Sequence, residues 1–162
     1  MGIRDKWVEF EDLNVLANRI AAVIREIKPE VVMTFNERIG GHPDHCAIGK
    51  AATLAFERSG LTSFETPGLA PFSSNRLYDV SYGNSMKKRP ERYGFSSAQI
   101  TAIDISGSLQ EKMRAFRCHR SQSEMNAWLW EPDRKALASF GRIEYFIQGH
   151  QPHTAGERDL FE

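Results

Sequence analysis

The chain has 162 residues, 41% of them hydrophobic and 26% charged, and its 21 basic residues equal its 21 acidic residues. This length and composition predict a single globular domain over residues 1–162 rather than a disordered chain. The zero net charge argues against a nucleic-acid partner, and the lack of a long apolar run argues against a membrane span or a signal peptide.

The first predicted elements are a helix over residues 12–28 and a strand over residues 31–35. The apolar residues of the helix recur at three- and four-residue steps, which places them on one face. They are Leu13, Leu16, Ile20, Val23, Ile24 and Ile27. Asp12 is the candidate N-cap, and Pro29 marks the end of the helix. The strand is a short run rich in apolar and β-branched residues, which predicts burial on both faces, as in a parallel sheet.

The sequence His42-Pro43-Asp44-His45 follows this strand after a polar, glycine-containing turn. A second helix is predicted over residues 46–58, and it can begin as early as Pro43, because proline is tolerated at the first helical position. Ligand sites in α/β sheets lie beyond the carboxyl ends of the strands, which is where this motif falls.

The rest of the chain predicts further strands and one more helix. The expected elements are a loop over 60–74, a strand over 76–82, a basic exposed loop over 87–94, a strand over 100–105, a helix carrying Leu109, Met113 and Phe116 with Ser106 or Ser108 as its cap, and a strand over 143–147. Strands that alternate with helices are typical of an α/β domain.

The residue types of the motif suit metal or acid–base chemistry. Imidazole suits zinc and similar divalent metals, and carboxylate supplies a hard oxygen. His42 just before the helix and His45 in its first turn would converge above the helix N-terminus, which favours a developing negative charge. The alternative is structural, because an isolated His-x-x-His is common and Asp44 could merely cap the helix. A catalytic zinc site needs three protein ligands, so a partner from elsewhere would be required.

Other reactive residues carry weaker signals. His119 lies toward the end of a predicted helix, where the dipole alone favours it. His150 and His153 lie in a polar tail without periodicity, and Lys87-Lys88-Arg89 is expected to be a solvated loop. The two cysteines, Cys46 and Cys118, form no CxxC pair, which indicates a reduced, cytoplasmic setting.

With the motif in this context, the sequence resembles the LmbE-like/PIG-L family of metal-dependent N-acetylglucosamine deacetylases. The matching segments are residues 27–35, 41–45, 49–52, 103–106, 119–122, Glu144-x-Phe146 and 159–161, together with Lys112 and Ala115. Residues 2–6 and 9–12 are similar to the bacillithiol-pathway members, which act on N-acetylglucosaminyl malate. The resemblance implies a Rossmann-like, mostly parallel sheet flanked by helices, and a small sugar conjugate as substrate.

The resemblance also implies roles for four residues. His45 corresponds to a metal ligand, for Zn²⁺ or another divalent metal such as Fe²⁺. His42 corresponds to a residue that, in its cationic form, stabilises the oxyanion or protonates the leaving amine. Asp44 corresponds to a residue that orients its neighbours, and Arg76 resembles the arginine that assists it.

One departure from the family shapes the functional expectation. The family begins with a strand ending in a His-Pro-Asp-Asp motif, which supplies two metal ligands and the general base, whereas the only HPD triplet here is residues 42–44. We therefore expect a domain that lacks the family's N-terminal strand and helix, with weak metal binding and little turnover. The alternatives are a non-catalytic remnant that acts as an oligomerisation or interaction module, including a homo-oligomer, and a different metallohydrolase completed by a partner chain.

Overall fold

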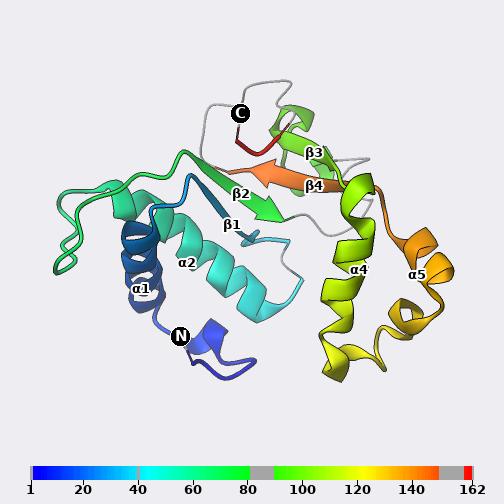
Figure 1. The fold of residues 1–162 in the computed structure, drawn as a ribbon. Coiled ribbons are helices and arrows are strands. Elements are labelled where there is room, and N and C mark those ends of the chain that lie inside the picture. Colours follow the sequence, from blue (N-terminus) through cyan, green and yellow to red (C-terminus); the bar gives the residue numbers. More distant parts are fainter. Residues whose placement is uncertain (1, 40, 81–89, 150–158, 162) are drawn as a thin grey trace. The chain divides into compact units, whose positions relative to one another are not determined.

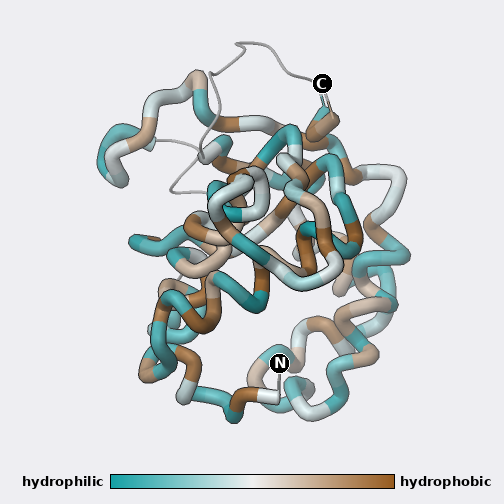
Figure 2. The backbone as a smooth tube through the Cα atoms, turned by 90° about the vertical axis from the view of Figure 1, so that its left-hand side faces the viewer, coloured by the Kyte–Doolittle hydropathy of each residue, from teal (hydrophilic) through white to brown (hydrophobic). Residues whose placement is uncertain are grey.

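The computed structural model describes residues 2–39, 41–80, 90–149 and 159–161 (Figure 1). The chain divides into two compact units, one of residues 1–101 and 145–162 and one of residues 102–144. Hydrophobic stretches along the backbone are short and are interrupted by hydrophilic ones (Figure 2). Over the described residues, no helix is long and apolar enough to cross a membrane.

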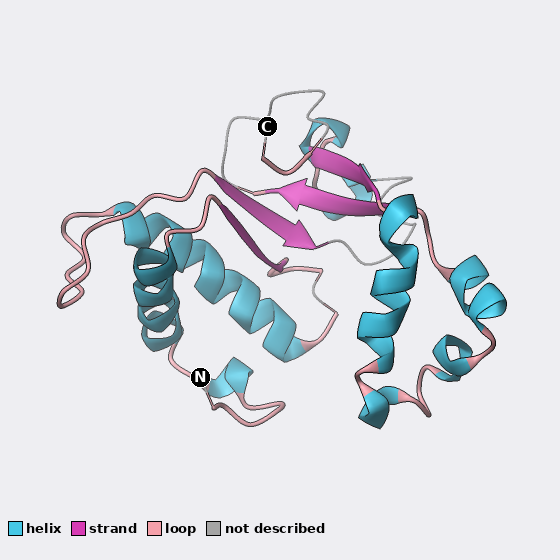
Figure 3. Cartoon of the chain, in the orientation of Figure 1, coloured by secondary structure: helices cyan, strands magenta, loops and turns pink. Residues whose placement is uncertain are grey.

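The helices and strands follow the predicted order closely (Figure 3). The α-helices and strands are α1 (Leu13–Ile27), β1 (Val31–Phe35), α2 (Pro43–Gly60), β2 (Arg76–Val80), β3 (Ile100–Asp104), α4 (Leu109–Arg117), α5 (Asp133–Ser139) and β4 (Ile143–Gln148). The 3-10 helices are Val8–Phe10, Pro90–Tyr93, Ser97–Gln99, Ser106–Ser108, Arg120–Gln122 and Ala127–Trp130. Helix α5 and the 3-10 helices did not emerge from the sequence, because short elements show too little periodicity.

Helix α1 begins and ends where its flanking residues predict. The Asp12 carboxylate accepts hydrogen bonds from the backbone N–H groups of Asn14 and Val15, at 2.8 and 2.9 Å, which confirms Asp12 as the N-cap. At the other end Lys28 adopts a left-handed conformation, with φ of 54°, and donates its backbone N–H to Ile24. Pro29 then follows, as expected for a chain that leaves the helix.

The four strands form one mixed sheet in the order β1-β2-β4-β3. Strand β1 pairs in parallel with β2, with Val31 opposite Arg76 and Phe35 opposite Val80, whereas β4 runs antiparallel to β2. The α/β fold is therefore confirmed, and the sheet combines both strand directions. The expectation that β1 is covered on both faces is wrong at Met33, which is 46% exposed. Val32 packs on the helices, and alternation along the strand turns Met33 to the opposite face.

The core of the first unit lies where α1 and α2 pack side by side beneath β1 and β2 (Figure 1). Its buried cluster consists of Ala17, Ala21, Ile24 and Ala55, with Val32 packed against it. The packed face of α1 is thus rotated toward its alanines, and Ile27 at the edge of the expected apolar stripe is 67% exposed. Alanine at the contact allows two helices to approach closely, which the larger apolar residues would prevent.

The second unit is built around α4 and α5. Met113, Leu129 and Ala136 are buried in it. The guanidinium of Arg117 donates hydrogen bonds to Leu129 O, Glu131 O and the Asp133 carboxylate. Ser108 occupies the expected capping position of α4, but its side chain makes no cap hydrogen bond. Hydrogen bonds from Ser106 and the nearby Arg142 guanidinium lower the pKa of the exposed Asp104 carboxyl group below its ordinary value.

Candidate active site

His42 caps helix α2 at its N-terminus. Its backbone is extended, with φ of −118° and ψ of 141°, and Pro43 occupies the first helical position, as predicted. The Nδ1 atom of His42 accepts a hydrogen bond of 3.2 Å from the backbone N–H of Asp44. In this contact Nδ1 acts as the acceptor, which matches the ring tautomer that has its proton on Nε2.

His45 lies in the first turn of the helix, beside the end of β1. Its ring stacks on Phe35, the last residue of the strand, with a centroid separation of 4.0 Å and an interplanar angle of 6°. The rings of His42 and His45 are 5.4 Å apart, so the motif brings its two histidines together above the helix N-terminus, as the spacing predicted. Phe35 was not singled out in the sequence, although its place at the strand end was a signal.

Asp44 is buried and holds the N-terminal segment rather than a neighbouring arginine. Its carboxylate accepts hydrogen bonds from the backbone N–H of Lys6 at 2.6 Å and of Glu9 at 3.2 Å. Lys6 takes a left-handed conformation, with φ of 64°. Because the helix cap is His42, the structural alternative that Asp44 caps α2 is wrong. Asp44 lies in the first turn, where a negative charge also favours the helix dipole.

An Asp44→Asn substitution is expected to lower the free energy of unfolding by about 1 to 2 kcal/mol. The new amide can accept one of the two backbone hydrogen bonds, but its NH₂ group would face the other donor. Urea unfolding would measure the loss, with Asp5→Asn, at an exposed position beside Lys6, as the matched control. Equal stability of the two variants would contradict the anchoring role of Asp44.

Arg76 lies away from the motif. It is the first residue of β2 and pairs with Val31, whereas the motif follows Phe35 at the other end of β1. In parallel strands the two amino ends share one edge of the sheet, so a strand of five residues separates Arg76 from the site. The strand register therefore places Arg76 and Asp44 at opposite ends of β1, and a role for Arg76 in the site stays a prediction.

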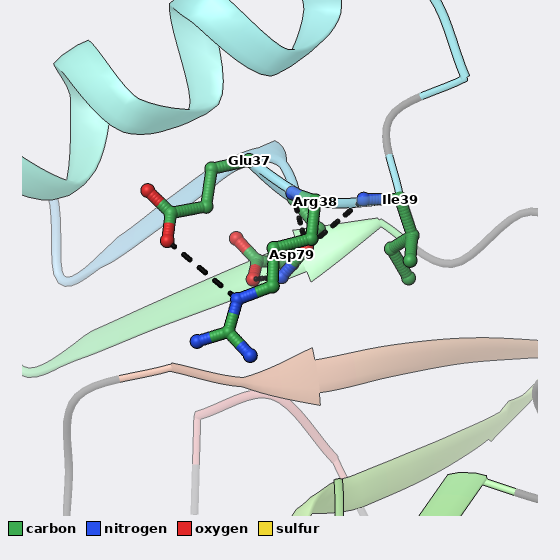
Figure 4. Close-up of polar contacts among 5 residues, drawn as sticks. Glu37, Arg38, Ile39 and Asp79 are labelled. Carbon is green, nitrogen blue, oxygen red and sulfur yellow. Dashed lines mark hydrogen bonds and ion pairs between the residues drawn. The ribbon is translucent and has the colours of Figure 1, made fainter. Parts of the chain in front are cut away.

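The polar residue that β2 places at the carboxyl edge is Asp79. It pairs with Thr34 in the sheet, and its carboxylate accepts a hydrogen bond of 2.6 Å from the Asn36 side-chain amide. Both side chains are buried. Figure 4 shows Asp79 reaching from its strand toward the turn of Glu37, Arg38 and Ile39. The signal in the sequence was a single carboxylate between Tyr78 and Val80, inside a strand of otherwise mostly apolar residues.

The donor set does not amount to a complete metal centre. Within the described ranges, no three residues of the types His, Cys, Asp and Glu gather into a group that could hold a metal. Asp44 and the Nδ1 atom of His42 already have backbone partners. Among the described residues, His45 is therefore the member of the motif whose side chain stays the predicted ligand for zinc or iron, and further ligands would be needed.

The remaining histidines are His119, His150 and His153. His119 belongs to the second unit, where it precedes the 3-10 helix Arg120–Gln122 and makes no side-chain cap. His150 and His153 lie outside the described residues, as does the basic run 87–89.

Comparison with known proteins identifies similar sequences. Residues 1–56 match the family model described as "PIG-L: GlcNAc-PI de-N-acetylase". A Bacillus cereus protein named "Probable N-acetyl-alpha-D-glucosaminyl L-malate deacetylase 2" is 31% identical over 76% of this chain and 49% of its own length. A Saccharomonospora viridis protein, "1D-myo-inositol 2-acetamido-2-deoxy-alpha-D-glucopyranoside deacetylase", is 30% identical over 88% of this chain and 56% of its own. The chain thus spans about half the length of these curated relatives.

A solved structure shows the same fold. The conserved protein TT1542 from Thermus thermophilus superimposes with a TM-score of 0.67 at 22% identity, over 98% of this chain and 68% of that one. At this identity the likeness extends to the fold, and it agrees with the α/β arrangement of helices and strands described above.

Proposed function

Because this chain belongs to the PIG-L/LmbE-like deacetylase family, we propose that it takes part in hydrolysis of the N-acetyl group of an N-acetylglucosamine conjugate. The observation that supports the proposal is the pairing of His42 and His45, whose rings lie 5.4 Å apart above the N-terminus of α2. The two relatives named above act, by their names, on a malate and a myo-inositol conjugate of acetylated glucosamine. We favour the malate conjugate, since residues 2–6 and 9–12 resemble that subfamily.

In this reaction water adds to the acetamide carbon, the C–N bond breaks, and acetate and a free amine leave. With Nδ1 occupied by the backbone of Asp44, His42 can donate its Nε2 proton as a hydrogen bond to the carbonyl oxygen. The positive end of the α2 dipole adds to the stabilisation of the oxyanion. The geometry therefore favours the oxyanion role of His42 over protonation of the leaving amine, which would need a cationic ring.

His45 remains the predicted metal ligand in this proposal. Its ring is held flat against Phe35, which restricts the directions in which its nitrogens can face a metal or substrate. Metal ions that accept imidazole include both Zn²⁺ and Fe²⁺. Both cysteines are free thiols, which fits a reducing compartment, and we place the reaction in the cytoplasm.

The test combines binding with turnover on the purified protein. N-acetylglucosaminyl malate and the myo-inositol conjugate would be added with Zn²⁺ or Fe²⁺ while acetate release and the imidazole NMR signals are followed. We expect the malate conjugate to shift the ring signals of His42 and His45. We expect acetate release to fall at least tenfold in His45→Ala and in His42→Ala, with Glu26→Gln on the exposed side of α1 as the unaffected control.

Two results would oppose the proposal. One is that neither conjugate shifts the ring signals, and the other is that acetate release by the unchanged protein equals that of His45→Ala. An oligomer that holds no metal under these conditions would instead favour the interaction module considered from the sequence. Light scattering on the same samples would detect it.

A further inference from the structure

A buried polar pair lies beneath the turn that leads into the candidate active site. Asn36 follows β1 directly and Asp79 belongs to the neighbouring strand β2, so both lie at the carboxyl edge of the parallel pair. Asn36 is 6% exposed and Asp79 is 7% exposed. The Asn36 Nδ2 atom donates to the Asp79 carboxylate at 2.6 Å, which is a charge-assisted hydrogen bond.

The other end of the Asn36 amide organises the turn. Its Oδ1 atom accepts hydrogen bonds from the backbone N–H groups of Arg38 at 2.9 Å and Ile39 at 3.3 Å. An amide has a donor end and an acceptor end, so the carboxylate of Asp79 decides which end faces the turn. Reversal of the amide would set its NH₂ against two backbone donors and its oxygen against a carboxylate.

Helix α2 holds the same turn from the other side. Gly49 packs so closely on the end of β1 that an added Cβ would lie 3.1 Å from the Glu37 nitrogen and 3.0 Å from the Phe35 carbonyl carbon. Phe35 in turn carries the stacked ring of His45. The turn is therefore confined between the helix backbone and the Asn36–Asp79 pair. His42, three residues after Ile39, occupies the N-cap position of α2.

We propose that Asn36 and Asp79 form a positioning pair that orients the entry into α2 and thereby the His42 and His45 rings. The pair acts through the turn and does not touch the substrate; the inference rests on the deacetylase function proposed above. A buried carboxylate is costly to desolvate, and apolar residues of similar volume are often as stable or more so. Its place next to the candidate site therefore points to a requirement for one defined geometry.

An exchange of the two side chains tests this directly. Asn36→Asp places two carboxylates in contact and removes the donor between them. Asp79→Asn together with Asn36→Asp restores a donor facing an acceptor, and the new carboxylate at position 36 can still accept from Arg38 and Ile39. The exposed substitution Asp5→Asn serves as a control for the change in charge.

Three measurements follow the series, well below the unfolding temperature of each variant. We expect Asn36→Asp to accelerate amide hydrogen exchange at Arg38 and Ile39 at least tenfold, to displace the His42 and His45 ring signals, and to lower kcat at least tenfold with KM changed less than threefold. We expect the double exchange to return all three to within threefold of the unchanged protein.

The possible results distinguish a failure of the positioning role from a failure of the proposed function. Failure of the double exchange to restore the ring signals, or an Asn36→Asp variant that matches the unchanged protein, would overturn the positioning role. If the unchanged protein releases no acetate, the proposed function fails. In that case the positioning role is still tested by two measurements, which are amide hydrogen exchange at Arg38 and Ile39 and the NMR signals of the two histidine rings.

Discussion

A Gly49→Ala substitution is expected to lower the free energy of unfolding by about 2 to 3 kcal/mol. This loss of stability is opposite in direction to the usual effect, because a glycine-to-alanine substitution inside an exposed helix stabilises the protein by about 1 kcal/mol. Here the added Cβ would overlap the carbonyl oxygen of Phe35 and approach the Glu37 nitrogen. Both are backbone atoms, so neither can move aside by a change of rotamer, and α2 must separate from the end of β1.

Urea unfolding of Gly49→Ala would measure the loss, and the imidazole NMR signal of His45 would report the strain on its stack with Phe35. The matched control is Gly107→Ala, where an added Cβ meets no heavy atom within 4 Å and φ is not in the left-handed region. We expect the control to stay within about 0.5 kcal/mol of the unchanged protein. A Gly49→Ala variant as stable as this control would show that the helix does not press on the strand.

An Arg25→Met substitution is expected to lower the free energy of unfolding by about 3 kcal/mol. Arg25 is only 2% exposed, and its guanidinium donates to Ser59 O at 2.9 Å, to Leu61 O at 2.6 Å and to Thr66 Oγ1 at 3.2 Å. The first two acceptors lie at the carboxyl end of α2, so the cation also opposes the negative end of the helix dipole.

Methionine matches much of the volume of Arg25 but donates no hydrogen bond. The Ser59 and Leu61 carbonyl oxygens would each lose the guanidinium and keep one backbone donor, from Phe72 and Phe64. The guanidinium carbon also lies 5.0 Å from the centre of the Phe64 ring, a contact that methionine replaces only in part. The control is Arg134→Met, at an exposed position of helix α5, expected to change stability by about 0.5 kcal/mol or less. Chemical unfolding of both variants makes the comparison. Equal losses would contradict the view that Arg25 ties the end of α2 and the following loop to α1.

Much of the local structure could be predicted from the sequence because it rests on neighbours in the chain. Asp12 and Pro29 bound α1, and Pro43 fits the first position of α2. The approach of His42 to His45 follows from the helical spacing. These features depend on backbone groups within a few residues, which the order of amino acids specifies directly.

The contacts that complete the site could not be predicted in the same way. Arg76 matched a family expectation by residue type, yet the register of β1 and β2 places it at the far edge and brings Asp79 to the near one. Asp44 looked suited to orient its neighbours, yet its partners are backbone groups of the N-terminal segment. Strand register and long-range hydrogen bonds depend on how distant segments pack. The local periodicity of the sequence carries no information about that packing.

The sequence by itself determined the α/β pattern, the family and the meeting of two histidines at the start of a helix. The tertiary structure decided which residues support them. Arg25 belongs to no motif, and Gly49 entered the sequence analysis only as part of a matching segment. The structural role of both arises because α2 lies against the end of β1 and beside α1. A short-range pattern encodes where an element begins and which face it presents. The pairing of buried polar groups is decided only when the helices and strands pack. A buried polar group without a partner is costly, so the favoured packing is the one in which such groups are hydrogen-bonded to each other.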